Sequence, residues 1–195
     1  MPREIRLYFE GDKSLKPGFD AFLQEIRARA GAARWKVSII ATGGNPERDF
    51  SIALRKHPEA SNVLLRDSEG RYEPRLSGCL CEKHGWPMAQ ADAIFWMVQM
   101  MESWFHADKD ALEKYYGKGF HKSALSANSN VEEIAKADLI EGLKAATKDT
   151  TKGKYHKTKH APDLLRLVRP EVVRKAAPNC DKLFVEVLAR VTAMT

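Results

Sequence analysis

The fold is decided first by residues 4–12, which read EIRLYFEGD. Their apolar, aromatic run stops abruptly at Glu10, as a buried strand does where it enters a loop. Residues 35–41 (WKVSIIA) and 62–66 (NVLLR) repeat this pattern, and helical periodicity over 19–31 and 45–57 separates the three runs. The alternation of strand and helix predicts right-handed crossovers and a mostly parallel central sheet with helices on both faces, which is an α/β fold.

Capping residues mark where the helices begin and end. Gly31 stands where a helix C-cap is expected. Asn45, followed by Pro46, has the residue type of an N-cap at the start of the next helix. Asp108 is expected to cap a helix over residues 111–116 in the same way.

The second half of the chain has a different pattern. Residues 70–93 contain Gly, Pro and Cys and are expected to form a long loop, either an insertion or a lid. A fourth strand is expected over residues 93–98. We therefore predict an α/β core over 1–120 and a C-terminal helical extension over 121–195 that packs on it as one compact unit. The helices of this half are expected over residues 100–106, 131–147, 162–168, 170–177 and 181–194.

Composition agrees with a single folded domain, since 44% of the 195 residues are apolar and 30% are charged. Three cysteines without repeated spacing are a poor disulfide framework. Cys79, Cys81 and His84 resemble a fragment of a zinc site, although ordinary loop cysteines explain them better. The N-terminus has no signal-peptide pattern and no apolar run reaches membrane-span length, so a cytoplasmic protein without a membrane partner is expected.

Carboxylates follow two of the expected strands. Glu10 ends the first run, and Asp67 with Glu69 ends the third. Two residues apart on an extended backbone, Asp67 and Glu69 project to one face. In open parallel sheets chemistry sits at the carboxyl ends of the strands, and oxygen-only ligands suit Mg²⁺ or Mn²⁺. Glu102 is expected at the same edge, although a glutamate there also suits the helix dipole, and exposed acids at loop starts are common.

A lysine-rich segment is the main source of the formal charge of +6 and the sequence pI of about 9.2. Residues 144–159 carry six lysines against Asp149. Lysines at this density can neutralise phosphates and bind nucleic acid, but they also suit a solvated loop, and both interpretations stay open here. The candidate nucleic-acid-binding residues are Lys152, Lys154, Lys157 and Lys159.

These residues resemble a known family. The runs 8–11 (YFEG) and 67–70 (DSEG) look like the two motifs of the Toprim fold, a glutamate-glycine after the first strand and an acidic pair after the third. Nearly the whole chain resembles domain-of-unknown-function family 4276 (DUF4276), in the Toprim-like group. The segments that carry this resemblance most clearly are residues 100–108 (MMESWFHAD), 115–117 (YYG) and 152–157 (KGKYHK).

The resemblance implies roles for the acids. Glu10 corresponds to the acid or base, Asp67 and Glu69 to ligands of Mg²⁺ (or Mn²⁺), and Glu102 to a suspected further ligand. It also implies a Mg²⁺-dependent nuclease or related phosphodiester-processing enzyme, similar to overcoming-lysogenisation-type nucleases that often work with an ATPase in phage defence. Glu69 and Ser14 stand where many Toprim proteins have aspartate, which motivates an alternative.

That alternative is a catalytically inactive Toprim-like module that binds an ATPase or nucleic acid. A metal-dependent reaction on a small phosphate substrate is a third hypothesis. The sequence leaves open whether DNA or RNA is the substrate, how many metals bind, and what the oligomeric state is.

Overall fold

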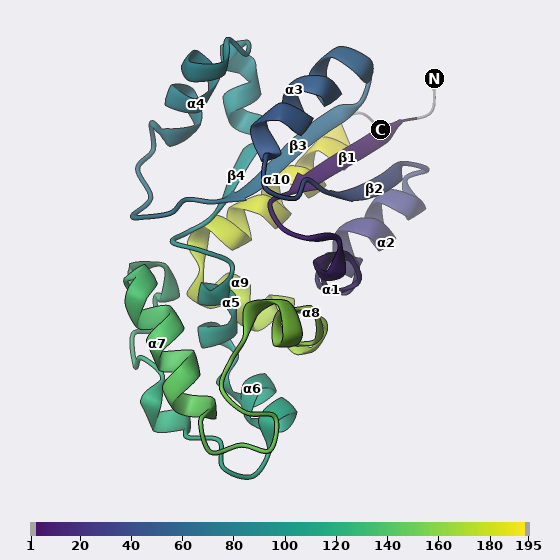
Figure 1. The fold of residues 1–195 in the computed structure, drawn as a ribbon. Coiled ribbons are helices and arrows are strands. Elements are labelled where there is room, and N and C mark those ends of the chain that lie inside the picture. Colours follow the sequence, from purple (N-terminus) through teal and green to yellow (C-terminus); the bar gives the residue numbers. More distant parts are fainter. Residues whose placement is uncertain (1–2, 194–195) are drawn as a thin grey trace.

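A parallel sheet forms the centre of the molecule in the computed structural model, which describes residues 3–193 (Figure 1). Its strands lie in the order β2-β1-β3-β4, and every pairing is parallel, as predicted. Phe9, at the end of β1, lies beside Ala41 of β2 and Leu65 of β3, so the carboxyl ends share one edge. The strands are β1 Glu4–Phe9, β2 Lys36–Ala41, β3 Ser61–Asp67 and β4 Ile94–Met97.

Helices cover both faces of this sheet, which confirms the predicted α/β class. The α-helices are α1 Lys16–Phe22, α2 Gln24–Ala32, α3 Pro46–Lys56, α4 Leu76–His84, α5 Glu102–Ala107, α6 Lys109–Tyr116, α7 Lys136–Thr147, α8 Lys157–Leu167, α9 Pro170–Ala176 and α10 Pro178–Ala193. The short 3₁₀ helices are η1 Lys13–Leu15, η2 Met88–Ala93, η3 Lys122–Ala124 and η4 Val131–Glu133. Within residues 3–193, no helix has the length and apolarity that crossing a membrane requires.

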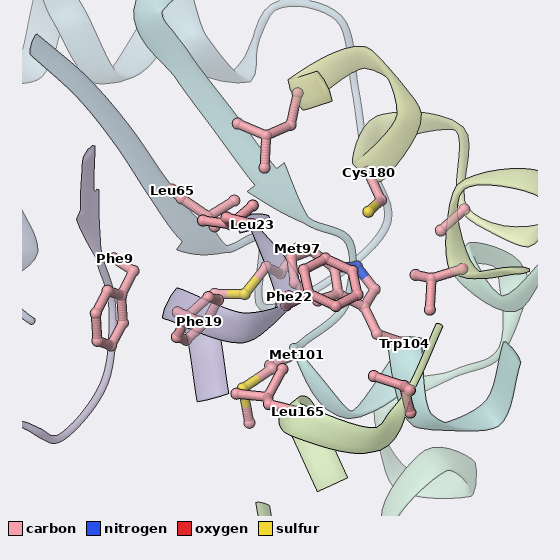
Figure 2. Packing of buried hydrophobic residues seen from close by; sticks show 14 of the residues in the cluster. Phe9, Phe19, Phe22, Leu23, Leu65, Met97, Met101, Trp104, Leu165 and Cys180 are labelled. Atoms are coloured by element: carbon pink, nitrogen blue, oxygen red, sulfur yellow. The ribbon is translucent and has the colours of Figure 1, made fainter. Parts of the chain in front are cut away.

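Alternate residues of each strand bury into two separate cores, because successive side chains of a strand point to opposite faces. Phe9 and Leu65 enter the larger core with α1, α2, α5 and α10, where Phe22 stacks on Trp104 with ring centroids 4.7 Å apart (Figure 2). Tyr8, Leu64 and Trp96, whose side chains point to the opposite face, enter the smaller core with residues of α3 and α4. Burial on both faces explains the nearly continuous apolar runs in the sequence.

Helix α8 packs closely on α1, although the two are far apart in sequence. Gly18 makes this approach possible, since a Cβ there would lie 2.6 Å from Leu165 Cβ and 2.9 Å from the carbonyl oxygen of Pro162. The contact holds the N-terminus of α8 beyond the carboxyl ends of the strands (Figure 1).

The larger core continues into the last third of the chain. Helix α10 packs on β4 and α2, with Phe184 and Val187 fully buried. Residues on both sides of position 120 therefore share one hydrophobic cluster. The division into 1–120 and 121–195 stays a prediction, with α10 contributing to the cover of the sheet.

Two local predictions were wrong. The helix expected over 19–31 is interrupted at Leu23 (φ −94°, ψ 19°), and Gly31 lies inside α2, whose C-cap is Ala33. The long loop expected over 70–93 contains α4 and η2 instead, because Leu80 and Cys81 bury against the smaller core.

The predicted caps at Asn45 and Asp108 are confirmed. Asn45 accepts a hydrogen bond from the backbone N–H of Arg48 at 3.0 Å, and Asp108 accepts one from Ala111 at 3.2 Å. The helix expected over 131–147 begins with the 3₁₀ turn η4, and its α-helical part starts at Lys136.

Candidate active site at the carboxyl edge of the sheet

Three carboxylates from separate segments lie in the same neighbourhood beyond the strand ends. Glu10 follows β1, Asp67 ends β3, and Glu102 opens α5 just after β4. The backbone N–H of Asp67 donates to Glu10 Oε2 at 3.2 Å, and Asp67 Oδ1 accepts from the N–H of Met101 at 2.8 Å. These bonds join the ends of β1 and β3 to the start of α5.

Gly11 allows the chain to turn away directly after Glu10. Its φ of +144° suits glycine, and a Cβ there would lie 2.7 Å from Leu15 Cδ1. Its carbonyl oxygen accepts from the N–H of Gly43 at 3.0 Å, which ties the loop after β1 to the loop after β2. Glycine therefore follows Glu10 in the sequence because the backbone turn at this position requires it.

Lys157, the first residue of α8, provides the cation that faces the acids. Its Nζ lies 3.6 Å from Glu102 Oε2 and 3.8 Å from Asp67 Oδ2. Glu102 has no exposed surface, and its Oε1 accepts a hydrogen bond from the hydroxyl of Tyr155 at 2.8 Å. Within the part of the chain that the structure describes, Glu102 Oε2 has no hydrogen-bond donor.

Glu10 has a different basic neighbour. Arg66 Nε lies 3.6 Å from Glu10 Oε2, and the same guanidinium pairs with Glu47 on α3. Its Cζ also lies 5.5 Å from the ring centroid of Trp96, a cation–π distance. Arg66 is therefore held in place from three sides beside Glu10.

Burial dominates the titration of these groups. It raises the pKa of Asp67 to about 7, against the lowering effect of Lys157, while Glu102 and Glu10 raise it further. Burial also raises the pKa of Glu10, and Arg66 offsets part of that shift. Burial alone would lower the pKa of Lys157, but Glu102 and Asp67 outweigh it and the pKa is raised.

Glu69 does not join this group as the sequence predicted. Strand β3 ends at Asp67, and Glu69 has a left-handed backbone with φ 63°, so the extended geometry that would place both acids on one face is absent. The Glu69 carboxylate forms an ion pair with Lys136 at the start of α7, and 53% of its side chain is exposed. It still lies close enough to Glu10 to raise the pKa of that group slightly.

The structure separates the four candidate lysines. Lys157 turns toward the acids, whereas Lys152, Lys154 and Lys159 are exposed. Lys152 Nζ lies 4.6 Å from the ring centroid of Tyr115. Lys152 and Lys154 lie in the loop before α8, and Lys159 lies in the first turn of this helix.

Sequence reasoning missed three of the groups that complete the site. Arg66 and Tyr155 were not singled out, and Lys157 was assigned to nucleic acid rather than to the acids. Arg66 directly precedes the run 67–70, and Tyr155 lies within the run 152–157, both of which carry the resemblance. Proximity to those motifs was the signal available.

The donor set suits a hard divalent cation, because every acceptor facing Lys157 is a carboxylate oxygen. Among residues 3–193, no three His, Cys, Asp or Glu side chains converge closely enough to hold a metal ion in this arrangement. A basic side chain lies against each acid instead. Cys79 and Cys81, the suspected zinc fragment, carry free thiols on α4, and the His84 ring stacks on Trp86.

A solved structure with the same fold comes from an OLD protein. The C-terminal region of the Burkholderia pseudomallei OLD protein matches with a TM-score of 0.57 and 11% sequence identity, over 96% of this chain and 98% of that one. The C-terminal region of the Xanthomonas campestris pv. campestris OLD protein matches with a TM-score of 0.48 and 10% identity, over 97% of each chain. The first match agrees with the predicted Toprim-like α/β fold.

Sequence comparison gives two further findings. The GTPase Era of Aquifex aeolicus (strain VF5) is 24% identical over 109 residues, which are 54% of this chain and 36% of that protein. The chain thus spans about a third of the length of this curated relative. The profile described as "Domain of unknown function (DUF4276)" matches residues 13–188. The chain therefore belongs to the DUF4276 family.

Proposed function

We propose that the protein is a Toprim-type nuclease, or a related phosphodiester-processing enzyme, that depends on a divalent metal ion. The observation that carries this proposal is the fully buried Glu102, whose Oε2 has no hydrogen-bond donor among the described residues and faces Asp67 across Lys157. A buried carboxylate oxygen without a donor is costly, so its presence at the sheet edge favours a cation-binding role.

Each acid has a distinct role in the proposal. Asp67 and Glu102 would hold Mg²⁺ or Mn²⁺, and Glu10 would act as acid or base or as a third ligand. The raised pKa of Glu10 brings its proton affinity closer to neutral pH, where general acid–base catalysis is most effective. The bound ion would supply a Lewis acid and a more acidic water. Glu69 would join the ligands after release from Lys136.

The exposed lysines define the side from which the substrate would approach. Lys152, Lys154 and Lys159 are exposed on the same segment as Lys157 and would neutralise backbone phosphates without reading sequence. The Tyr115 ring, under Lys152, lies beside this strip and belongs to the same surface. The proposed substrate is therefore a nucleic acid.

A cleavage assay on labelled DNA and RNA tests the enzyme. Wild type is compared with Asp67→Asn, Glu102→Gln and Glu10→Gln in the presence of Mg²⁺ or Mn²⁺. Cleavage is expected to require the metal and to fall at least about a hundredfold in each variant. The matched control is Asp110→Asn, an exposed acid outside the site, which is expected to cleave like wild type. Cleavage without metal, or equal cleavage by all variants, contradicts the proposal.

One observation favours the alternative, a non-catalytic binding module. Each acid of the site already has a basic partner: Arg66 for Glu10, Lys157 for Asp67 and Glu102, and Lys136 for Glu69. Salt-dependent nucleic-acid binding together with no Mn²⁺ binding in calorimetry would support the module over the enzyme. In either form, we propose on the resemblance alone that the protein works with an ATPase, a setting that includes phage defence.

A further inference from the structure

The position of Lys157 carries an inference that rests on the proposed function. We propose that Lys157 is a built-in counter-ion that occupies the cation position between Asp67 and Glu102, so that metal binding and the inward position of Lys157 exclude each other. Lys157 would thereby regulate metal loading of the site and would not be one of its fixed supports.

The distances support a replaceable contact. At 3.6 Å and 3.8 Å, the two Lys157 ion pairs are longer than an N–H···O hydrogen bond, which is typically about 2.7–3.2 Å. Glu102 Oε2 keeps no hydrogen-bond donor within the described residues. The ammonium thus screens both carboxylates without satisfying either closely.

Charge points the same way. Lys157 brings one positive charge to Asp67 and Glu102, which together can bring two negative charges. Arg66 lies on the other side of the site, beside Glu10 and Glu47. A divalent cation would match both carboxylates, whereas Lys157 matches one.

Lys157 can leave without disturbing the fold around the acids. It is the first residue of α8, and 45% of its side chain is exposed, so its flexible stem can turn the ammonium into solvent. Glu102 would stay in place through Tyr155, and Asp67 through the backbone N–H of Met101. The exchange therefore needs a rotamer change of one side chain.

Isothermal calorimetry with Mn²⁺ tests the inference. Lys157→Met removes the charge and keeps an unbranched stem, and Lys154→Met is the matched control from the same segment. Lys157→Met is expected to bind Mn²⁺ at least about tenfold more tightly than wild type, which is about 1.4 kcal/mol. Lys154→Met is expected to stay within about twofold of wild type, because Lys154 is exposed and forms no ion pair with Glu10, Asp67 or Glu102 within residues 3–193.

A second measurement uses the unaltered protein, in case Lys157→Met folds poorly. Acetylation of lysines, read residue by residue by mass spectrometry, is followed with and without Mn²⁺. Lys157 is expected to react several times faster with Mn²⁺ present, because the metal releases its ammonium, while Lys154 reacts equally in both.

The outcomes separate this inference from the proposed function. If wild type binds Mn²⁺ but Lys157→Met binds it equally or more weakly, or if Mn²⁺ protects Lys157 from acetylation, the counter-ion role is overturned and the metal site stands. If neither wild type nor Lys157→Met binds Mn²⁺, the metal-dependent function fails, and the counter-ion role fails with it.

Discussion

Removing the hydroxyl of Tyr155 tests how Glu102 is held. Tyr155 is 4% exposed and donates to Glu102 Oε1 at 2.8 Å, and its ring packs edge-on against Phe105. Tyr155→Phe keeps the ring and leaves a fully buried carboxylate without its hydrogen-bond donor. A hydrogen bond to a charged group contributes about 1.5–3 kcal/mol, so we expect the free energy of unfolding to fall by about 2 kcal/mol. For a chain of this size that lowers Tm by about 4–8 °C.

Urea unfolding followed by circular dichroism, without metal, measures the change. Tyr115→Phe is the matched control, because Tyr115 donates to the exposed Asp163 at 3.4 Å and its loss should cost less than about 0.5 kcal/mol. In the Glu102→Leu background the acceptor is absent, so adding Tyr155→Phe should no longer lower the free energy of unfolding. Equal, small effects of the two tyrosine variants would refute the reasoning.

The remaining predictions concern pH, packing and salt. Because the pKa of Asp67 is raised to about 7, a proton competes with the cation below that pH, and calorimetry should show Mn²⁺ affinity rising toward pH 7 and then levelling. The folded pKa lies above the unfolded one, so metal-free protein should also lose stability in urea as pH rises from about 4 to 7. Gly18→Ala should destabilise by about 1–3 kcal/mol in urea unfolding, whereas Gly31→Ala, with open space around its Cβ and a place inside α2, should stabilise slightly. In a salt titration, Lys154→Gln and Lys159→Gln should each reduce the slope of log Kobs for nucleic acid by about 1; an unchanged slope removes these lysines from the binding surface.

The sheet could be predicted from sequence because its signals are local. Strands β1 and β3 lie inside the sheet with helices on both faces, and the edge strand β2 is partly buried, so all three appear as largely apolar runs that end near Gly or acidic residues. Helix α4 could not be predicted in this way. It is short, and its Cys, Gly and Ser residues carry little helical periodicity, so only its contact with the smaller core reveals it.

The residues of the candidate site also divide into those that local sequence signals predict and those that depend on tertiary contacts. Glu10 and Asp67 could be predicted, because the position of each at the end of a strand places it at the carboxyl edge of the sheet. The direction of the Glu69 side chain depends on the left-handed backbone of Glu69 itself, which the spacing of residues in a strand does not predict. Lys157 and Tyr155 reach the site through the packing of α8 on α1, a contact between segments with no shared sequence pattern.

The contact between Gly18 and Leu165 has a consequence for the order of folding. Asp67 and Glu102 come together at the ends of the sheet and the start of α5, but their counter-charge, Lys157, arrives on α8. Long-range contacts such as that of α8 with α1 form late, because closing the intervening chain is entropically costly. We expect a refolding intermediate in which the sheet is assembled while Asp67 and Glu102 repel each other without a basic partner. Docking of α8 would end that frustration, so a single late step would complete both the hydrophobic core and the electrostatic balance of the site.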